Sequence, residues 1–275
     1  MNVISVSNLC KTFKVRQKQP GLINSIKSLF RSEYKEIKAV DDISFDVKKG
    51  EVLGLIGPNG AGKSTTIKML TGLLYPTSGE VHVLGYNPWK ERKKLLYKLG
   101  VIFGQRSQLW YHLPPSDTFN LIRNIYDIPK ETFEERLAYL SEFFDIKNLM
   151  NNPVRKLSLG QRMRVEFMAF LLHNPEVLFL DEPTIGMDIV VKQNVRNLIK
   201  QINQKEGKTI FLTSHDIGDI EKLCKRVIII NYGKIVFDGK LATLIKNYVH
   251  SKYIQVKLAS PLKALKYDGA TIIEQ

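Results

Sequence analysis

Short apolar runs recur along the chain, and glycine, proline or charged residues bound each of them. Such runs predict β-strands, whereas apolar residues at three- and four-residue spacing predict helices. Because the two patterns alternate, we predict an α/β fold with a mostly parallel sheet. Residues 8–11 are expected to form a turn. The expected strands are residues 3–6, 40–47, 52–56, 81–83, 101–103, 177–180, 209–213, 227–230 and 235–237.

The middle of the chain changes to a helical pattern, which predicts a helical insert at about residues 108–172. Apolar residues recur there at helical spacing, and breaks at 127–129 and 151–153 separate the expected helices. This insert interrupts one large domain, residues 1–240. Residues 241–275 are expected to form a small C-terminal extension that is incomplete on its own, with strands at 252–258 and 271–273.

An amphipathic insertion is expected at about residues 20–35. Apolar residues at positions 22, 23, 26, 29 and 30 share one helical face, with Lys27 and Arg31 beside it. Such a helix could lie on a membrane surface or a membrane partner, and it could equally pack on its own domain. The pattern does not choose between these two interpretations.

Composition indicates a folded protein with an anionic neighbour. Hydrophobic residues make up 44% of the 275 residues and charged ones 25%, which is typical of a globular chain. Lys and Arg number 41 against 27 Asp and Glu, a net charge of +14. This excess favours nucleic acid or the anionic face of a membrane, and simple solubility remains open.

Cysteine content and hydropathy indicate a reducing compartment and no membrane span. The two cysteines, Cys10 and Cys224, lie far apart and have no metal-binding spacing. The longest apolar runs are far shorter than the roughly 20 residues needed to cross a bilayer. We also expect no secretory signal at the start of the chain.

A glycine-rich segment, residues 57–65, carries the most specific chemical signal. It lies between an expected strand and an expected helix and has the spacing G-x-x-x-x-G-K-[ST] of a phosphate-binding loop. Backbone N–H groups can surround a triphosphate only where no Cβ intervenes, and a helix N-terminus adds partial positive charge. Lys63 is expected to reach the β- and γ-phosphates, and Ser64 to bind Mg²⁺. The segment comprises Gly57, Pro58, Asn59, Gly60, Ala61, Gly62, Lys63, Ser64 and Thr65.

Two carboxylates follow the apolar strand expected at residues 177–180. Because such a strand is buried, it should deliver Asp181 to the carboxyl edge of the sheet, where ligands bind in α/β folds. Asp181 is expected to hold Mg²⁺ through water there. Glu182 is expected to orient or deprotonate a water that attacks the γ-phosphate.

A second phosphate-binding segment is expected at residues 157–162, ahead of a helix at 163–172. Ser158 is a candidate N-cap, and free N–H groups at a helix start bind phosphate. The glycine-rich loop already encloses one side of a nucleotide. A second site of this kind therefore suggests a nucleotide held between two subunits.

These three segments together resemble the ATPase subunit of ABC transporters, and the resemblance covers residues 3–240. Residues 57–65 resemble Walker A, residues 177–182 Walker B, and residues 157–161 the signature sequence L-S-G-G-Q, with Leu159 in place of the first glycine. The amino-acid sequence near residues 66–74 and 177–187 is most similar to that of NatA-like, ABC-2-type exporters. The resemblance implies a P-loop cassette whose parallel core carries an antiparallel β subdomain and a helical insert.

The resemblance also implies roles for single residues. His215 corresponds to the switch histidine that touches the γ-phosphate, Gln105 (or, as fallback, Gln108) to the glutamine that joins Mg²⁺ and the attacking water, and Phe13 to the aromatic that stacks on adenine. Asp188 corresponds to a residue of the loop that crosses to the second subunit. Contact with the partner's ATP is expected from Ser158, Gly160 and Gln161.

The function implied by this resemblance is that of an ATP- and Mg²⁺-dependent motor. The resemblance implies a head-to-tail dimer, either homodimer or heterodimer, attached to an integral-membrane permease at the cytoplasmic side of the cell membrane. The aromatic cluster at residues 110–114 is expected either to line the groove for a permease helix or to form subdomain core. The alternatives are a soluble ABC ATPase that acts on nucleic acid or ribosomes, and a module that binds nucleotide without turnover. No nucleic-acid partner is expected, because neither a second cassette nor a long coiled coil is evident.

Overall fold

A six-stranded sheet forms the base of the candidate site. The computed structural model describes residues 1–16, 34–103 and 107–248. Within them the strand order of this sheet is β5-β6-β7-β3-β8-β9, and all neighbours are parallel except the β8–β9 hairpin. The prediction of a mostly parallel sheet is therefore confirmed. The strands are β3 (Val52–Ile56), β5 (Leu99–Phe103), β6 (Val177–Asp181), β7 (Thr209–Thr213), β8 (Arg226–Asn231) and β9 (Lys234–Lys240).

Several expected features lie outside the described residues. These are Gln105, most of the amphipathic insertion at 20–35, and the strands expected at 252–258 and 271–273. By its contacts the chain divides into two units, Met1–Leu241 and Ala242–Gln275. Helix α9 (Leu241–Tyr248) is the described element of the second unit.

A second, antiparallel sheet has the order β2-β1-β4, with β1 (Asn2–Arg16), β2 (Tyr34–Lys48) and β4 (Ser78–Val83). The turn expected at residues 8–11 is wrong, because β1 runs through it. The irregularity is absorbed by register shifts around Leu9 and by a φ of 48° at Asn8. The Asn8 N–H donates to Ser44 Oγ at 2.8 Å, so the bulged backbone stays paired.

The apolar core lies between the two sheets. Phe45 of β2 faces Phe211 of β7 at 6.0 Å between ring centroids, and Phe211 in turn contacts Phe179 of β6 at 5.7 Å. Helix α2 (Lys63–Leu70) adds fully buried side chains such as Ile67 and Met69. Fixing α2 between the sheets also fixes its first turn, which belongs to the glycine-rich loop.

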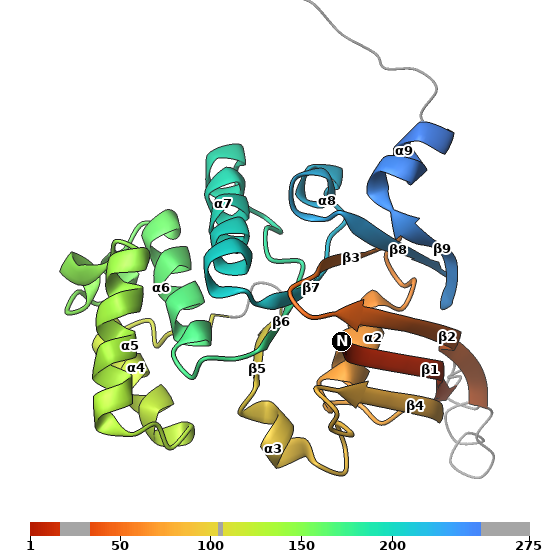
Figure 1. Ribbon diagram of the computed structural model, residues 1–275, viewed down its shortest axis with the longest axis horizontal. Helices are drawn as coiled ribbons and strands as arrows, with labels where there is room; N and C mark the ends of the chain where they lie inside the picture. Colours follow the sequence, from red (N-terminus) through yellow and green to blue (C-terminus); the bar gives the residue numbers. More distant parts are fainter. Residues whose placement is uncertain (17–33, 104–106, 249–275) are drawn as a thin grey trace, which may run out of the picture. The chain divides into compact units, whose positions relative to one another are not determined.

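The helical insert consists of α4 (Pro115–Ile125), α5 (Lys130–Phe143) and α6 (Leu159–Leu171), with two short 3₁₀ turns, Lys147–Leu149 and Val154–Lys156, between α5 and α6. In Figure 1 these helices, in green, lie together beyond β5 and β6, away from the antiparallel sheet. Helix α6 begins at Leu159 and not at Met163 as expected, because Ser158 and Gln161 form a capping box. Three more helices are α3 (Arg92–Leu96), α7 (Ile189–Glu206) and α8 (Ile217–Leu223).

His173, just after α6, joins the insert to the parallel sheet. Its ring stacks on Tyr126 with centroids 3.9 Å apart, and its Nε2 lies 2.8 Å from the Leu99 carbonyl oxygen of β5. Its Nδ1 is buried without a hydrogen-bond partner among the described residues. Burial lowers the pKa of His173 to about 4, because a charged imidazolium would lose its water there.

We predict that this histidine makes the fold acid-sensitive. Its pKa is depressed in the folded chain, so the unfolded chain binds the extra proton as pH falls from about 6.5 to about 4. The free energy of unfolding should drop across that window by about 3 kcal/mol and show no further loss from this group below it. His173→Phe keeps a stacking ring and should remove this component in denaturant titrations at several pH values. His82→Gln, at an exposed position on β4, is the control. An unchanged pH slope in His173→Phe would refute the prediction.

Candidate functional site

The loop at residues 57–62 leaves the end of β3 and enters α2, and two of its glycines are required by space. A Cβ on Gly57 would lie 2.2 Å from the carbonyl oxygen of Ile230, and one on Gly62 would lie 2.4 Å from that of Ala39. Gly62 also has a φ of 110°, which side chains rarely adopt. The loop therefore lies close against β2 and β8, as a tight cradle of backbone must.

Lys63, the first residue of α2, is a buried cation at the centre of this loop. Its Nζ donates to the carbonyl oxygens of Gly57 at 2.7 Å and Pro58 at 3.1 Å, and only 6% of the residue is exposed. A buried ammonium needs such partners, and an anion at the loop would be a stronger one. The position is suited to hold a phosphate against the backbone N–H groups of the helix start.

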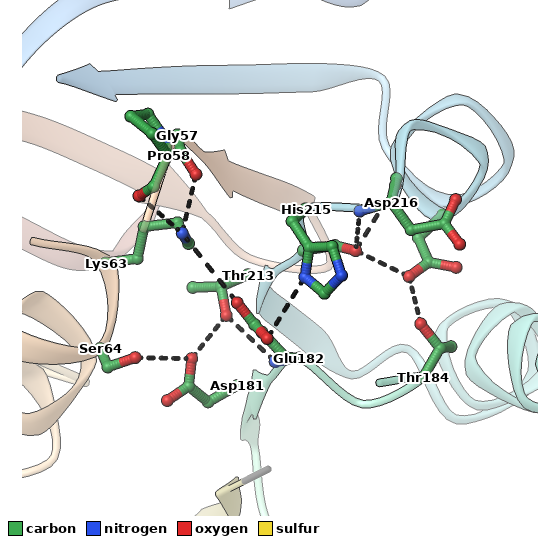
Figure 2. A network of polar contacts seen from close by, with 12 residues as sticks. Gly57, Pro58, Lys63, Ser64, Asp181, Glu182, Thr184, Thr213, His215 and Asp216 are labelled. Atoms are coloured by element: carbon green, nitrogen blue, oxygen red, sulfur yellow. Dashed lines mark hydrogen bonds and ion pairs between the residues drawn. The ribbon is translucent and has the colours of Figure 1, made fainter. Parts of the chain in front are cut away.

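Asp181, the last residue of β6, is shared by two hydroxyl groups. Its Oδ1 accepts hydrogen bonds from Ser64 Oγ at 3.1 Å and from Thr213 Oγ1 at 2.6 Å (Figure 2). Ser64 belongs to α2 and Thr213 ends β7. The Asp181 carboxylate thus connects the start of α2 to the ends of two adjacent strands, β6 and β7.

Glu182 follows Asp181 in a strained backbone conformation, with a φ of 53°. Its N–H is held by Thr213, through the carbonyl oxygen and the side-chain oxygen, each at 3.1 Å. Its Oε1 lies 4.0 Å from Lys63 Nζ, and its Oε2 lies 3.3 Å from His215 Nδ1. The carboxylate therefore stands between the lysine and the histidine, as Figure 2 shows.

Five residues singled out in the sequence meet at this edge of the sheet: Lys63, Ser64, Asp181, Glu182 and His215. Thr213, which holds Asp181 and Glu182 in place, was missed by sequence reasoning. Its position at the end of the apolar run 209–213 is the only feature of the sequence that points to it. A hydroxyl there lies at the same edge of the sheet as Asp181, which pairs with Thr213.

The remaining expected residues lie elsewhere in the described structure. Phe13 of β1 is partly exposed, with Lys11 Nζ 5.3 Å from its ring centroid. Ser158 and Gln161 bond to each other at the start of α6, with Gly160 between them. Asp188 caps α7 by accepting the Val191 N–H at 2.9 Å. None of these contacts involves the loop at 57–62.

Glu166 of α6 is a second residue that sequence reasoning missed. Its carboxylate accepts hydrogen bonds from Ser107 Oγ at 2.5 Å and from the Gln108 N–H at 2.6 Å. Burial raises its pKa, although these two hydrogen bonds oppose the shift. Sequence reasoning could have found Glu166, because it is an acidic residue within an apolar stretch of α6. Gln108, the fallback for Gln105, is thus held through its backbone.

The oxygen atoms at the site suit Mg²⁺. No group of three His, Cys, Asp or Glu residues that could hold a metal occurs among residues 1–16, 34–103 and 107–248. The Ser64 hydroxyl and the Asp181 carboxylate lie together at the loop. Mg²⁺ prefers few protein oxygens and completes its shell with water and phosphate, so these residues fit it.

The helices of the described segments are all too short or too polar to span a membrane. None of them has both the length and the apolar composition that crossing a bilayer requires.

Comparison with known proteins agrees with the geometry. A family model described as ABC transporter matches residues 40–185. The ABC transporter ATP-binding protein NatA of Bacillus subtilis (strain 168) is 34% identical over 78% of this chain and 87% of that protein. The bacitracin transport ATP-binding protein BcrA of Bacillus licheniformis is 35% identical over 84% of this chain and 74% of that protein.

Among solved structures, a dimeric bacterial ABC transporter cassette matches with a TM-score of 0.67 and 25% identity, over 86% of this chain and 98% of that one. The resemblance based on the motifs is thereby confirmed, and a transport role is supported over an ATPase that acts on nucleic acid. The chain therefore belongs to the ABC transporter family, as an ATP-binding subunit with ATPase activity.

Proposed function

We propose that this subunit pairs head to tail with a second ATPase subunit and uses Mg²⁺-dependent ATP hydrolysis to drive export through an integral-membrane permease. The observation that carries the proposal is the meeting of Lys63, Ser64, Asp181, Glu182 and His215 at the carboxyl edge of the sheet. The motor would sit at the cytoplasmic side of the cell membrane. Export is favoured by the similarity of residues 66–74 and 177–187 to NatA-like, ABC-2-type exporters.

In this proposal the loop at 57–65 binds the triphosphate. Lys63 exchanges its loop carbonyl partners for β- and γ-phosphate oxygens, and backbone N–H groups at the start of α2 bind the remaining charge. Ser64 and Gln105 are the residues that would hold Mg²⁺, and Asp181 would hold it through water. When bound, Mg²⁺ neutralises charge that builds up on the phosphates.

Glu182 and His215 are the proposed catalytic pair. The Glu182 carboxylate accepts a hydrogen bond from the attacking water and takes its proton. His215, half-exposed and 3.3 Å from Glu182, would contact the γ-phosphate and orient this carboxylate. The strained Glu182 backbone, held by Thr213, fixes the direction of the base.

The second subunit would complete the nucleotide site. We propose that Phe13 stacks on adenine from one subunit, and that Ser158, Gly160 and Gln161 bind the γ-phosphate from the other. Space for this contact exists beside Gly160, because nothing outside the helix's own backbone lies within 4 Å of the place a Cβ would take. Asp188 would lie in the loop that crosses between the subunits. Leu159, which stands in place of the usual glycine, is partly exposed.

The permease would dock beside the helical insert. A cavity of about 200 Å³ lies between β5, α4 and α6, with Leu73, Gln108, Ile122 and His173 among its lining residues. Trp110 and Tyr111, 49% and 55% exposed, follow Gln108 closely in the chain. Exposed aromatics that follow a cavity-lining residue so closely in the chain suit a short amphipathic helix of a membrane partner.

We predict that Glu182→Gln binds ATP and hydrolyses it at least about a hundredfold more slowly, because an amide cannot accept the water's proton. ATP affinity by titration and phosphate release in steady state are the two measurements. Glu221→Gln, exposed on α8, is the matched control and should turn over normally. An unchanged steady-state rate in Glu182→Gln would remove this residue from its role.

We predict that Lys63→Ala lowers ATP affinity about 10- to 100-fold, the range expected for losing hydrogen bonds from a buried charge to phosphate. Binding of a fluorescent ATP analogue measures this directly. Lys68→Ala removes an exposed lysine of the same helix and should keep full affinity. Wild-type affinity in Lys63→Ala would count against the phosphate loop.

We predict that Trp110→Ser with Tyr111→Ser weakens attachment to the permease at least about tenfold. The measurement is the amount of tagged subunit that remains on membranes holding the co-expressed permease, at equal total subunit. Tyr232→Ser, at an 86% exposed tyrosine in the β8–β9 turn, serves as the control. Full retention of the double variant would show that these aromatics are not part of the docking surface.

A further inference from the structure

Behind the catalytic pair lies a buried carboxylate, that of Asp219 on α8, which no solvent reaches. Its Oδ2 accepts hydrogen bonds from Thr184 Oγ1 at 2.5 Å and from Ser214 Oγ at 2.7 Å. Its Oδ1 accepts from Arg196 Nε of α7 at 2.6 Å. Asp219 is 0% exposed and Arg196 7%, so the charges have each other as partners in place of water.

The two hydroxyl donors come from the loops that carry the catalytic pair. Thr184 is two residues after Glu182, and Ser214 immediately precedes His215. Both donate to the same oxygen atom, Oδ2 of Asp219. The loop after β6 and the loop after β7 are thus both held by Asp219, and each of these loops carries one of the two residues in the Glu182–His215 contact of 3.3 Å.

A second acidic residue, Asp216, extends this hydrogen-bond network. Its N–H donates to Ser214 Oγ at 2.9 Å, so this hydroxyl donates to one acid and accepts from the backbone of the other. The Asp216 carboxylate accepts from Lys192 Nζ at 2.6 Å and lies 3.3 Å from Arg196 Nη2. In the view of Figure 2, Thr184 and Asp216 lie beyond His215, on the side away from Lys63. Helix α7 thus contributes both cations to the two loops.

We propose that Asp219, with Arg196, is a positioning residue for hydrolysis. It holds the general base Glu182 and the switch histidine His215 in register by gripping Thr184 and Ser214. A carboxylate is needed because its one oxygen accepts from both hydroxyls while the other accepts from the guanidinium. An amide cannot do this, since its NH₂ group only donates. The inference rests on the proposed roles of Glu182 and His215.

The grip acts on turnover and not on nucleotide affinity. Among the described residues, no hydrogen bond joins the loop at 57–62 to Thr184, Ser214 or Asp219. The residues proposed to bind the nucleotide are Lys63 and Ser64. A catalytic group that shifts by about 1 Å can lose a hundredfold in rate. Loosening the grip should therefore lower kcat and leave the ATP dissociation constant nearly unchanged.

The test is Asp219→Asn in the full-length chain, compared with Asp238→Asn. The control breaks another Asp–Arg pair, that of Asp238 with Arg226 at 2.7 Å, on the β8–β9 hairpin. We expect kcat to fall at least about tenfold in Asp219→Asn, with ATP affinity within about twofold of wild type. The control should keep kcat. If Asp219→Asn keeps kcat as the control does, or loses affinity as much as rate, the proposal is wrong.

Combining the change with Glu182→Gln separates this proposal from the one on which it rests. If Asp219 works through Glu182, adding Asp219→Asn to Glu182→Gln should lower kcat by no more than about twofold further. A full additional tenfold loss would overturn the positioning role. If Glu182→Gln alone leaves the rate unchanged, the proposed catalytic role fails first, whatever Asp219→Asn does.

A hydroxyl swap tests the same grip without touching the buried charge, should Asp219→Asn fold poorly. Thr184→Ser keeps the donor to Asp219 and should hydrolyse ATP close to the wild-type rate. Thr184→Val keeps the volume, loses the donor, and should lower kcat at least about fivefold at equal ATP affinity. Equal rates in the two variants would overturn the proposal.

Discussion

A buried ammonium group at the start of α2 is the interaction on which the rest of the site depends. Lys63 has two loop carbonyl oxygens at hydrogen-bond distance and one carboxylate, that of Glu182, at 4.0 Å. A charge taken out of water has to be partnered, and carbonyl dipoles do this less well than anions do. The glycines that let the backbone approach this cation therefore create a place where a phosphate is the better partner.

Strand register explains why the other groups arrive at the same place. In the parallel sheet Leu55 pairs with Thr213, Thr213 with Asp181, and Asp181 with Phe103. All four strands thus end near one level. Because parallel strands share a carboxyl edge, the described segments that follow β3, β6 and β7 deliver their polar residues to one side. The hydroxyl of Thr213 and the carboxylate of Asp181 are neighbours for this reason alone.

The strands, the glycine-rich loop and the paired acids could be predicted because each has a local signal. An apolar run of residues predicts a buried strand, and glycines at fixed spacing mark close backbone approach, as at Gly57 and Gly62. The bulge at Asn8 could not be predicted, because cross-strand hydrogen bonds override propensity there. The start of α6 at Leu159 did have a local signal, the spacing of Ser158 and Gln161 that forms the capping box. Thr213 and Asp219 were missed because a threonine at a strand end, or an acid on a short helix, is ordinary until its partners are known.

Helix α6 gives the site a rigid link to the helical insert. Its first turn is capped by Ser158, whose side chain accepts the Gln161 N–H, and two turns later Glu166 accepts hydrogen bonds from Ser107 Oγ and the Gln108 N–H. Its last turns line the cavity beside β5. An α-helix of this kind transmits displacement along its length, since its hydrogen bonds are internal. A movement at the Ser158 end must therefore move Glu166 and the cavity wall, or break the two hydrogen bonds that join Glu166 to the segment after β5. With Ser158 at the partner's nucleotide and the permease beside the insert, as proposed, that constraint would connect the two sites.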